Sequence, residues 1–427
     1  MPLQIPSSLR FLAVGAALSL LLTTFLVFYA HSSSNDVAKY ALKTASQNPD
    51  CLSSSSNTTD SDWEFISSRD ADNLGLSETQ CRRAFPKLFY ELDKSVASRK
   101  DKPITLKELE SSPVEDGMVR GVIDRGELYI LDFAPQPHTF TRAKSTLHAL
   151  HRSLTSDPSR HTLPTISFLL TTDDLPPSTS SSSSITTPPI WSYTKQDHHT
   201  HVWLIPPFTH WTWPEVDIPP YRTVRHQITT LESALPFEHK TKQLLWRGAI
   251  APNPPVRNAL LAAARGQSWS SIHPLDWASP ASLQATRLPI SEHCRYQFLA
   301  HTEGRSFSGR GAYLLNCRSV LISHPLVWRE LHHAALVKTG PEMNYVEVKG
   351  DWSDLGDKMR FLLGNEEVAE GIAARAVRVF RERYLTPAAE ACYWRELVRG
   401  WARVGRFEGV GEGRERGVPF EEWVLMN

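Results

Sequence analysis

The chain has 427 residues, with 46 Lys and Arg against 46 Asp and Glu, so its formal net charge is zero. This balance excludes a protein that binds nucleic acid through a chain-wide basic field. With 41% hydrophobic and 22% charged residues, the composition is that of a folded protein, and the length suits about two domains.

The first long apolar segment covers residues 11–30, which contain no charged side chain. A helix of that length spans about 30 Å, the thickness of the hydrocarbon core of a bilayer. A cleavable signal peptide is the alternative, but Phe28 makes a poor cleavage site and the stretch exceeds the roughly 7–15 residues of a signal core. We therefore expect a cytoplasmic tail over residues 1–10, an uncleaved transmembrane signal-anchor over 11–30, and a luminal body.

Residues 31–75 are rich in Ser, Asn, Asp and Thr and lack apolar periodicity. This composition predicts a disordered stem that does not pack against the body. Asn57 precedes two threonines, which makes it a candidate N-glycosylation acceptor in the stem.

The residues after the stem alternate between helix and strand patterns as far as residue 234. The patterning predicts a helix over residues 85–96, a hairpin over 118–133 that turns at Asp124-Arg125-Gly126, a helix over 141–154 and a buried strand over 165–171. The strand is followed by Asp173 and Asp174 and then by a low-complexity loop over 178–187. These elements form the expected N-terminal domain, residues 76–234.

The same alternation continues over residues 235–404. Strands are expected at 243–246, 319–322 and 345–348, and helices at 256–264, at 313–316 and after Asn365, whose side chain can cap a helix. Alternating strands and helices predict α/β domains with parallel sheets. The Gly-rich and charged residues from 405 predict a loose tail over 405–427.

A Gly- and Ser-rich segment before the expected helix at 313 is the most informative stretch. It contains Gly304, Ser306, Ser308, Gly309 and Arg310. Small residues let backbone N–H groups approach an anion, the positive end of a following helix favours negative charge, and an arginine adds a bidentate fork. An ordinary turn is the alternative, and the segment matches neither a Walker loop nor a dinucleotide fingerprint.

Two other polar groups follow expected strands. Arg247 and Gly248 end the strand at 243–246, and Asp173 and Asp174 follow the strand at 165–171. Ligands of α/β domains bind outside the carboxyl ends of strands, so the arginine could bind an anion and a carboxylate could act as a general base. A surface arginine and a polar turn are the alternatives.

Several other polar and aromatic groups carry weaker signals. His198, His199 and His201, and likewise the pair His332 and His333, resemble metal clusters but lie in polar surroundings, so we expect no metal site. Asp-x-Asp pairs occur only in the expected stem. The side chains of Trp203, Trp211 and Trp213 could stack on sugars or form part of the core.

Five motifs occur in a fixed order along the second half of the chain. They are Trp246-Arg247-Gly248, the run Cys-Arg-Tyr-Gln-Phe-Leu at 294–299, Ser308-Gly309-Arg310, the run Asp-Trp-Ser-Asp-Leu at 351–355, and Cys392-Tyr393-Trp394. Together they resemble glycosyltransferase family 90, which includes fungal capsule-associated xylosyltransferases and Rumi-type protein O-glucosyltransferases. The resemblance runs from about Cys81 to Trp401, and the residues near Cys81 look like the fungal branch.

The resemblance implies a GT-B architecture, in which two Rossmann-like domains face a cleft and the C-terminal one binds a UDP-sugar. It also implies an inverting transfer of xylose or glucose to a hydroxyl of a glycan or protein, without a metal or other cofactor. Asp174 matches the general base, with Asp173 as the neighbouring alternative. The matching donor-site residues are Arg247, Gly248, Arg257, Gly304, Ser306, Ser308, Gly309 and Arg310.

The resemblance further suggests disulfides between Cys294 and Cys317 and between Cys392 and an N-terminal cysteine, most simply Cys81, which leaves Cys51 unpaired or intermolecular. We expect a single-pass type II protein of the Golgi or ER membrane with a luminal catalytic domain. One alternative is a catalytically inactive carbohydrate- or protein-binding member of the fold. A glycosidase is the other, but it needs two carboxylates that flank one bond, and Asp173 and Asp174 are adjacent.

Overall fold

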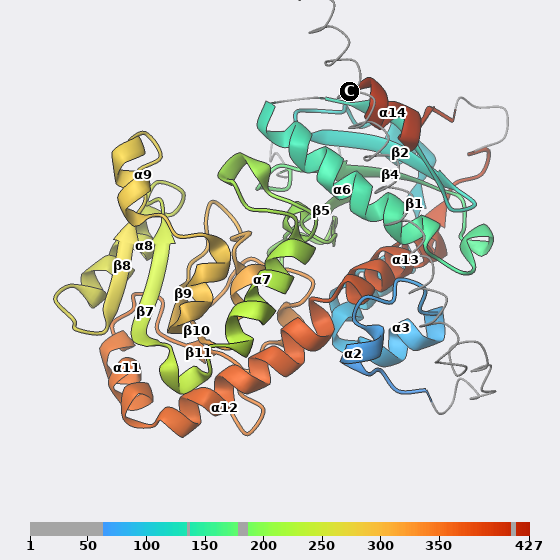
Figure 1. Ribbon diagram of the computed structural model, residues 1–427. Helices are drawn as coiled ribbons and strands as arrows, with labels where there is room; N and C mark the ends of the chain where they lie inside the picture. Colours follow the sequence, from blue (N-terminus) through green and yellow to red (C-terminus); the bar gives the residue numbers. More distant parts are fainter. Residues whose placement is uncertain (1–62, 135–136, 178–186, 411–415) are drawn as a thin grey trace, which may run out of the picture. The chain divides into compact units, whose positions relative to one another are not determined.

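The computed structural model describes residues 63–134, 137–177, 187–410 and 416–427 (Figure 1). Contacts divide the chain into residues 1–63 and residues 64–427, and the fold described below is that of the second unit. Residues 1–62 lie outside the described part. They include the expected cytoplasmic tail at 1–10, the signal-anchor at 11–30, most of the stem, Cys51 and Asn57. Among the helices of the described part, none is long and apolar enough to cross a membrane.

One sheet collects strands from the first half of the chain and one from its end. Its order is β13 (Val418–Pro419), β3 (Glu127–Phe133), β2 (Met118–Asp124), β4 (Ile166–Thr171), β5 (Ile190–Ser192) and β6 (Val202–Leu204). The β2–β3 hairpin is confirmed, and its two turn residues, Arg125 and Gly126, have positive φ angles of 50° and 83°. Positive φ at both positions suits the twist of a two-residue hairpin turn.

The expectation of a parallel first sheet is wrong for half of its strands. β2 pairs antiparallel with both β3 and β4, and only β4, β5 and β6 run parallel to one another. The two-residue turn at Arg125 and Gly126 explains the difference, because it forces its flanking strands to be antiparallel, whereas a parallel pair requires a long crossover.

The second sheet is parallel throughout, as expected. Its order is β11 (Val346–Glu347), β10 (Val320–Ser323), β9 (Tyr296–His301), β7 (Thr241–Gly248) and β8 (Ser270–Pro274). Chain order reverses between β7 and β9, so the crevice beyond their carboxyl ends is where an open α/β sheet binds ligands. The core against this sheet includes Trp246, Phe298 and Trp352, each no more than 1% exposed.

The helices cover both sheets and connect their strands. They are α2 (Ser67–Asp70), α3 (Glu78–Ala84), α4 (Tyr90–Ser98), α5 (Leu106–Glu110), α6 (Pro137–Thr155), α7 (Tyr221–Ser233), α8 (Pro254–Ala264), α9 (Pro280–Thr286), α10 (Gly311–Leu314), α11 (Leu355–Gly364), α12 (Glu366–Ala376), α13 (Pro387–Val404) and α14 (Phe420–Met426). Shorter elements are the 3₁₀ turns η2 (Pro86–Phe89), η3 (Arg160–Thr162), η4 (Phe208–His210), η5 (Pro214–Val216), η6 (Phe237–His239), η7 (Ile290–Arg295) and η8 (His333–Ala335), the π-helix η9 (Val377–Tyr384), and the parallel pair β1 (Ile104–Thr105) and β12 (Gly405–Arg406).

The expected cap of α12 is wrong in detail. Asn365 lies at the N-cap position, but its side-chain amide donates to the Phe361 carbonyl (2.7 Å) and makes no cap bond. The buried face of the helix includes Ile372 and Ala376, whereas Val368 in its first turn is 43% exposed.

Ordered structure begins before residue 75, within the segment that the composition assigned to the stem, so the predicted boundary is wrong. Asp70 is 1% exposed and accepts a hydrogen bond from the Ile66 amide (2.8 Å), which closes the α2 turn. The amide of Ala388 donates to the Ala71 carbonyl (3.0 Å), so this segment contacts α13. Although the segment has no apolar periodicity, local hydrogen bonds to a side chain and contact with a distant helix hold it in place.

The loose tail predicted over residues 405–427 is also wrong at its end. β13 pairs antiparallel with β3, and Trp423 of α14 is 2% exposed, with its ring edge-on to Phe133 (centroids 5.2 Å apart). The Gly- and charge-rich residues precede this segment, and 411–415 lie outside the described residues.

The last long helix, α13, does not stay with the second sheet, although it falls within the expected domain 235–404. It packs against α3, α4 and α6, and α6 lies along the first sheet (Figure 1). The disulfide Cys81–Cys392 joins α3 to α13, and Cys294–Cys317 joins η7 to a residue three positions beyond the end of α10. Both disulfides that the family resemblance implied are therefore present.

We expect the two disulfides to contribute unequally to the free energy of unfolding. Their sequence separations are 311 residues for Cys81–Cys392 and 23 for Cys294–Cys317. In the chain-entropy model, loops of these lengths correspond to roughly 6 and roughly 3 kcal/mol. Urea unfolding of the Cys81→Ser/Cys392→Ser and Cys294→Ser/Cys317→Ser variants measures the two losses. A larger loss for the shorter loop would contradict the expectation.

Candidate functional site

A pocket of about 280 Å³ lies beyond the carboxyl ends of β7 and β9, where the order of the second sheet reverses. From the second half of the chain it is lined, among others, by Arg247, Gly248, Arg257, Gly304, Ser308, Gly309 and Arg310. From the first half it is lined by Arg142, Asp174, Phe208 and Trp213, among others. Two of the predicted site residues, Asp173 and Ser306, are not on its walls.

The three arginines predicted for the donor site differ in how many N–H donors remain for a ligand. A guanidinium has five. Arg247 directs four toward protein acceptors, namely the carbonyl oxygens of Thr286, Trp246 and Ser271 and the Ser271 hydroxyl. Arg257 directs three toward the carbonyl oxygens of Ala249 and Glu303. These two side chains therefore mainly hold the pocket wall.

Arg310 is the exception. Among the residues that the structure describes, no hydrogen-bond acceptor or carboxylate is recorded for its guanidinium, which lies over the Trp246 ring, 5.8 Å from its centroid. Burial, and then the charge of Arg257, lower the pKa of Arg310 to about 9, so it stays protonated at neutral pH. A partly desolvated cation without a protein anion favours an anionic ligand in the pocket.

The glycines of the pocket make room for protein groups. A Cβ on Gly248 would lie 3.0 Å from Arg310 Nη2 and 2.9 Å from the Trp246 ring, and one on Gly309 would lie 2.8 Å from Thr209 Cγ2. The reason given from sequence, close approach of an anion, is thus incomplete. The expected helix dipole is also weaker than thought, because α10 has only four residues.

The two candidate bases are clearly different in the structure. The Asp173 carboxylate is turned back and accepts a hydrogen bond from the Asp174 amide (2.5 Å). The Asp174 side chain, 32% exposed, reaches the pocket and pairs with Arg142 of α6, Oδ1 to Nη1 at 2.9 Å. The geometry therefore favours Asp174 as the residue that meets a ligand.

Ser306, predicted to bind the donor, is turned toward the opposite loop. Its hydroxyl donates to the backbone carbonyl of Asp174, and the residue is only 1% exposed. The Gly/Ser segment thus holds the Asp174 loop directly. This contact connects the two walls of the pocket.

His293 is a pocket residue that sequence reasoning missed. It lies in η7, is 4% exposed, and its pKa is lowered to about 3 by burial and then by Arg310 and Arg247. The side chain is therefore neutral and can accept or donate a hydrogen bond. The only sequence signal was its position next to Cys294.

The mouth of the pocket is formed by a contact between two loops. Arg287 donates to the carboxylate of Asp217 (2.8 Å) and lies over the exposed ring of Trp277, 5.8 Å from its centroid. Trp213 also lines the pocket, where its ring lies edge-on to that of Phe208 (centroids 5.4 Å apart). Trp203, in contrast, is a core residue (1% exposed), and Trp211 stacks on His148 (5.3 Å).

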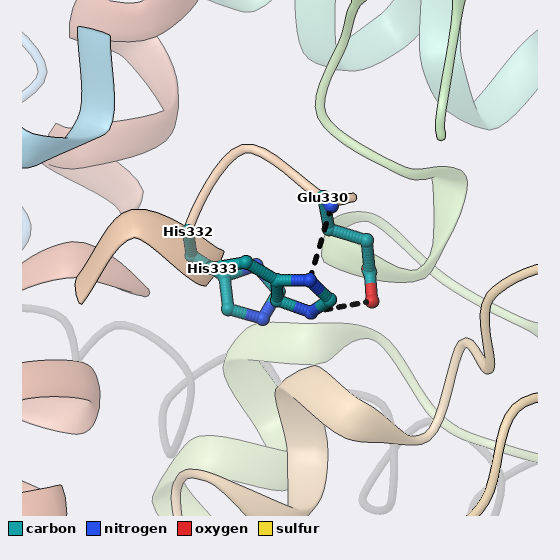
Figure 2. Close-up of side chains that lie close together, drawn as sticks. All are labelled: Glu330, His332 and His333. Carbon is teal, nitrogen blue, oxygen red and sulfur yellow. Dashed lines mark hydrogen bonds and ion pairs between the residues drawn. The ribbon is translucent and has the colours of Figure 1, made fainter. Parts of the chain in front are cut away.

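A second polar group is formed by Glu330, His332 and His333 (Figure 2). Their potential ligand atoms lie within 4.8 Å of one another, which makes the group a candidate metal centre. Figure 2 shows the His333 ring held by Glu330 on both sides: the Glu330 amide donates to Nδ1 (3.2 Å), and Nε2 lies 3.2 Å from the carboxylate. A metal-bound imidazole donates from its second nitrogen, but here Nδ1 accepts. The contacts fit a buried turn better than a ligand set.

His198, His199 and His201 also do not form a ligand set. Their rings lie near one another, with 4.1 Å between the centroids of His198 and His199. However, their nitrogens do not all lie within 4.8 Å of one another, as the ligand atoms of Glu330, His332 and His333 do. His201 Nε2 is 3.2 Å from the Pro177 carbonyl oxygen.

Comparison with curated proteins gives distant but consistent relatives. Protein O-glucosyltransferase 1 of Mus musculus is 24% identical over 262 residues, which are 57% of this chain and 64% of the mouse protein. The protein of the same name in Homo sapiens is 24% identical over 234 residues, which are 50% of this chain and 57% of the human protein. An O-glucosyltransferase rumi homolog of Aedes aegypti is 22% identical over 319 residues, 69% of this chain and 76% of the relative. The chain thus spans between about half and two thirds of the length of the mammalian relatives.

The family model named Glycosyl transferase family 90 matches residues 78–418. This range includes the second sheet, the first sheet except the last residue of β13, and every residue of the pocket described above. On this match, which covers most of the sequence and agrees with the five ordered motifs, the chain belongs to glycosyltransferase family 90.

Proposed function

We propose that the protein transfers a sugar from a UDP-sugar to a hydroxyl of a protein or glycan, with inversion at the anomeric carbon. One observation carries the proposal. A single pocket holds Arg310, for which the described residues supply no hydrogen-bond acceptor or carboxylate, and, on the wall formed by the other half of the chain, the carboxylate of Asp174. The first suits a diphosphate, and the second suits proton removal from an acceptor.

The proposed reaction breaks the bond between the anomeric carbon and the β-phosphate oxygen and forms a bond from that carbon to the acceptor oxygen. An oxocarbenium-like transition state leaves growing negative charge on the diphosphate. Arg310, with the remaining donors of Arg257 and Arg247, would stabilise this charge in a partly desolvated site. Asp174 would receive the proton of the acceptor hydroxyl.

Support for the substrate classes comes from different sources. The relatives are named O-glucosyltransferases, which favours glucose as the sugar and, for the mammalian proteins, a protein as the acceptor. Xylose stays a second candidate donor sugar on the resemblance to the fungal branch. Diphosphate binding by arginines without a metal remains part of the proposal, as does the absence of any other cofactor.

We also propose that residues 11–30 anchor the protein in the Golgi or ER membrane as a single-pass type II protein with its catalytic domain in the lumen. The two disulfides support an oxidising compartment. In that compartment Asn57 would be accessible for N-glycosylation.

A panel of UDP-sugars tests the proposal. With the purified full-length chain, EDTA and a hydroxyl acceptor such as a folded secreted domain, we expect UDP release from UDP-glucose or UDP-xylose and from few other donors. Binding of UDP without release from any donor would favour the inactive, binding-only alternative. Release that requires added manganese would contradict the metal-independent part of the proposal.

A further inference from the structure

Within the described part of the chain, Arg142 is the one residue whose side chain holds the Asp174 carboxylate. No sequence motif points to it. It lies in the 19-residue helix α6, and its side chain is 15% exposed. Nη1 is 2.9 Å from Asp174 Oδ1 and 3.5 Å from the Thr172 carbonyl oxygen, so one nitrogen contacts two points of the short segment that follows β4.

The plane of this guanidinium is also fixed. The Phe208 ring lies beneath it, with 4.7 Å from Cζ to the ring centroid, and Phe208 itself is 3% exposed. A stacked arginine loses little further freedom when it makes a hydrogen bond, because its planar fork is already oriented. Arg142 therefore presents a rigid donor to a carboxylate that follows the end of β4.

A general base must be held in one orientation, since a misplacement of about 1 Å can cost about 100-fold in rate. Arg142 occupies Oδ1 of Asp174, whereas no partner is recorded for Oδ2 among the described residues. Oδ2 is thus the oxygen that remains for an acceptor proton. The Ser306 hydroxyl, bonded to the backbone carbonyl of Asp174, fixes the same residue from the other wall.

We propose that Arg142 is the positioning residue of the general base: it orients the Asp174 carboxylate for proton removal and does not bind the donor. This inference rests on the proposed function, in which Asp174 is the base. The competing role is a donor contact, since Arg142 also lines the pocket and a diphosphate could attract it.

The two roles separate in the kinetics of Arg142→Gln. A positioning role predicts a fall in kcat of about 100-fold, with the Kd of UDP within about twofold of the wild type, because UDP makes no contact with Asp174 in this scheme. Arg142→Lys should recover part of kcat, and guanidinium ion at tens of millimolar should raise the rate of Arg142→Ala. A loss of UDP affinity as large as the loss of kcat/KM would assign Arg142 to the donor instead, and an unchanged kcat would remove it from the reaction.

Arg152 provides a matched control on the same helix. It pairs with the Glu390 carboxylate at 2.8 Å and lies over the Trp211 ring at 4.5 Å, but it does not line the pocket. Arg152→Gln breaks the same kinds of contact, so it measures the cost to stability, and its folded fraction should keep the wild-type kcat. If it loses as much kcat as Arg142→Gln, the effect is structural and the proposal fails.

A double-mutant cycle with Asp174→Asn separates this inference from the proposed function. If Asp174 is the base and Arg142 acts through it, Arg142→Gln should cause no further loss of kcat in the Asp174→Asn background. Losses that multiply would overturn the positioning role. Full activity of Asp174→Asn alone would instead refute the assignment of Asp174 as the base in the proposed function, whatever Arg142→Gln does.

Discussion

Arg310→Ala is expected to lose about 10²–10³-fold in turnover, the effect of removing one donor that stabilises charge in a transition state. UDP affinity should fall with it, because none of the residues that the structure describes accepts a hydrogen bond from this guanidinium, so its donors are available to the diphosphate. Turnover of a UDP-sugar and calorimetric binding of UDP measure the two effects. Arg310→Lys keeps the charge but loses the planar fork of donors, so its turnover and UDP affinity should lie between those of the wild type and those of Arg310→Ala.

The same change should leave the melting temperature intact or raise it. Burial lowers the pKa of Arg310 to about 9, which means that the folded protein holds this charge at a cost. Arg247→Ala is the contrasting variant, since it removes donors from three backbone carbonyl oxygens and should destabilise the fold. Near-normal turnover in folded Arg310→Ala would exclude its role in the reaction.

Asp174→Asn is expected to lose about 10²–10⁴-fold in transfer, the range for removal of a general base, while UDP still binds. The asparagine carbonyl can still accept from Arg142, so the side chain should stay in place and lose only its ability to take a proton. Transfer to an acceptor and UDP affinity, measured on the same preparation, test both statements.

Asp173→Asn is the matched control because it makes the same chemical change one residue earlier. Its carbonyl oxygen can still accept from the Asp174 amide, so we expect transfer to be retained. Loss at Asp173→Asn with activity retained at Asp174→Asn would move the base by one residue.

The second half of the site could be predicted because its residues are close together in the sequence. Gly304 to Arg310 lie in one segment, and Arg247 ends a strand, so motif order and the rule for parallel strands were enough to bring them together. The β2–β3 hairpin was predictable for the same reason, since its turn residues are local.

The rest depended on contacts between distant segments. The rest of α6 and the strand β4 separate Arg142 from Asp174 in the sequence, and only the packing of α6 brings Arg142 Nη1 to 2.9 Å from Asp174 Oδ1. Ser306 belongs to the predicted loop, yet its hydroxyl faces the opposite wall. The ordered end of the stem and helix α14 were missed because partners more than 200 residues away bury them, and no local pattern records such a partner.

The bridge between α3 and α13 has a consequence for biosynthesis. Cys81 precedes its partner Cys392 by 311 residues, so at about 5–20 residues per second the ribosome needs roughly 15–60 s to supply the second thiol. During that interval Cys81 has no native partner, while Cys294 and Cys317 can close soon after their synthesis. The α3 segment therefore waits for the end of translation before it is fixed, and thiol isomerases have time to act on it.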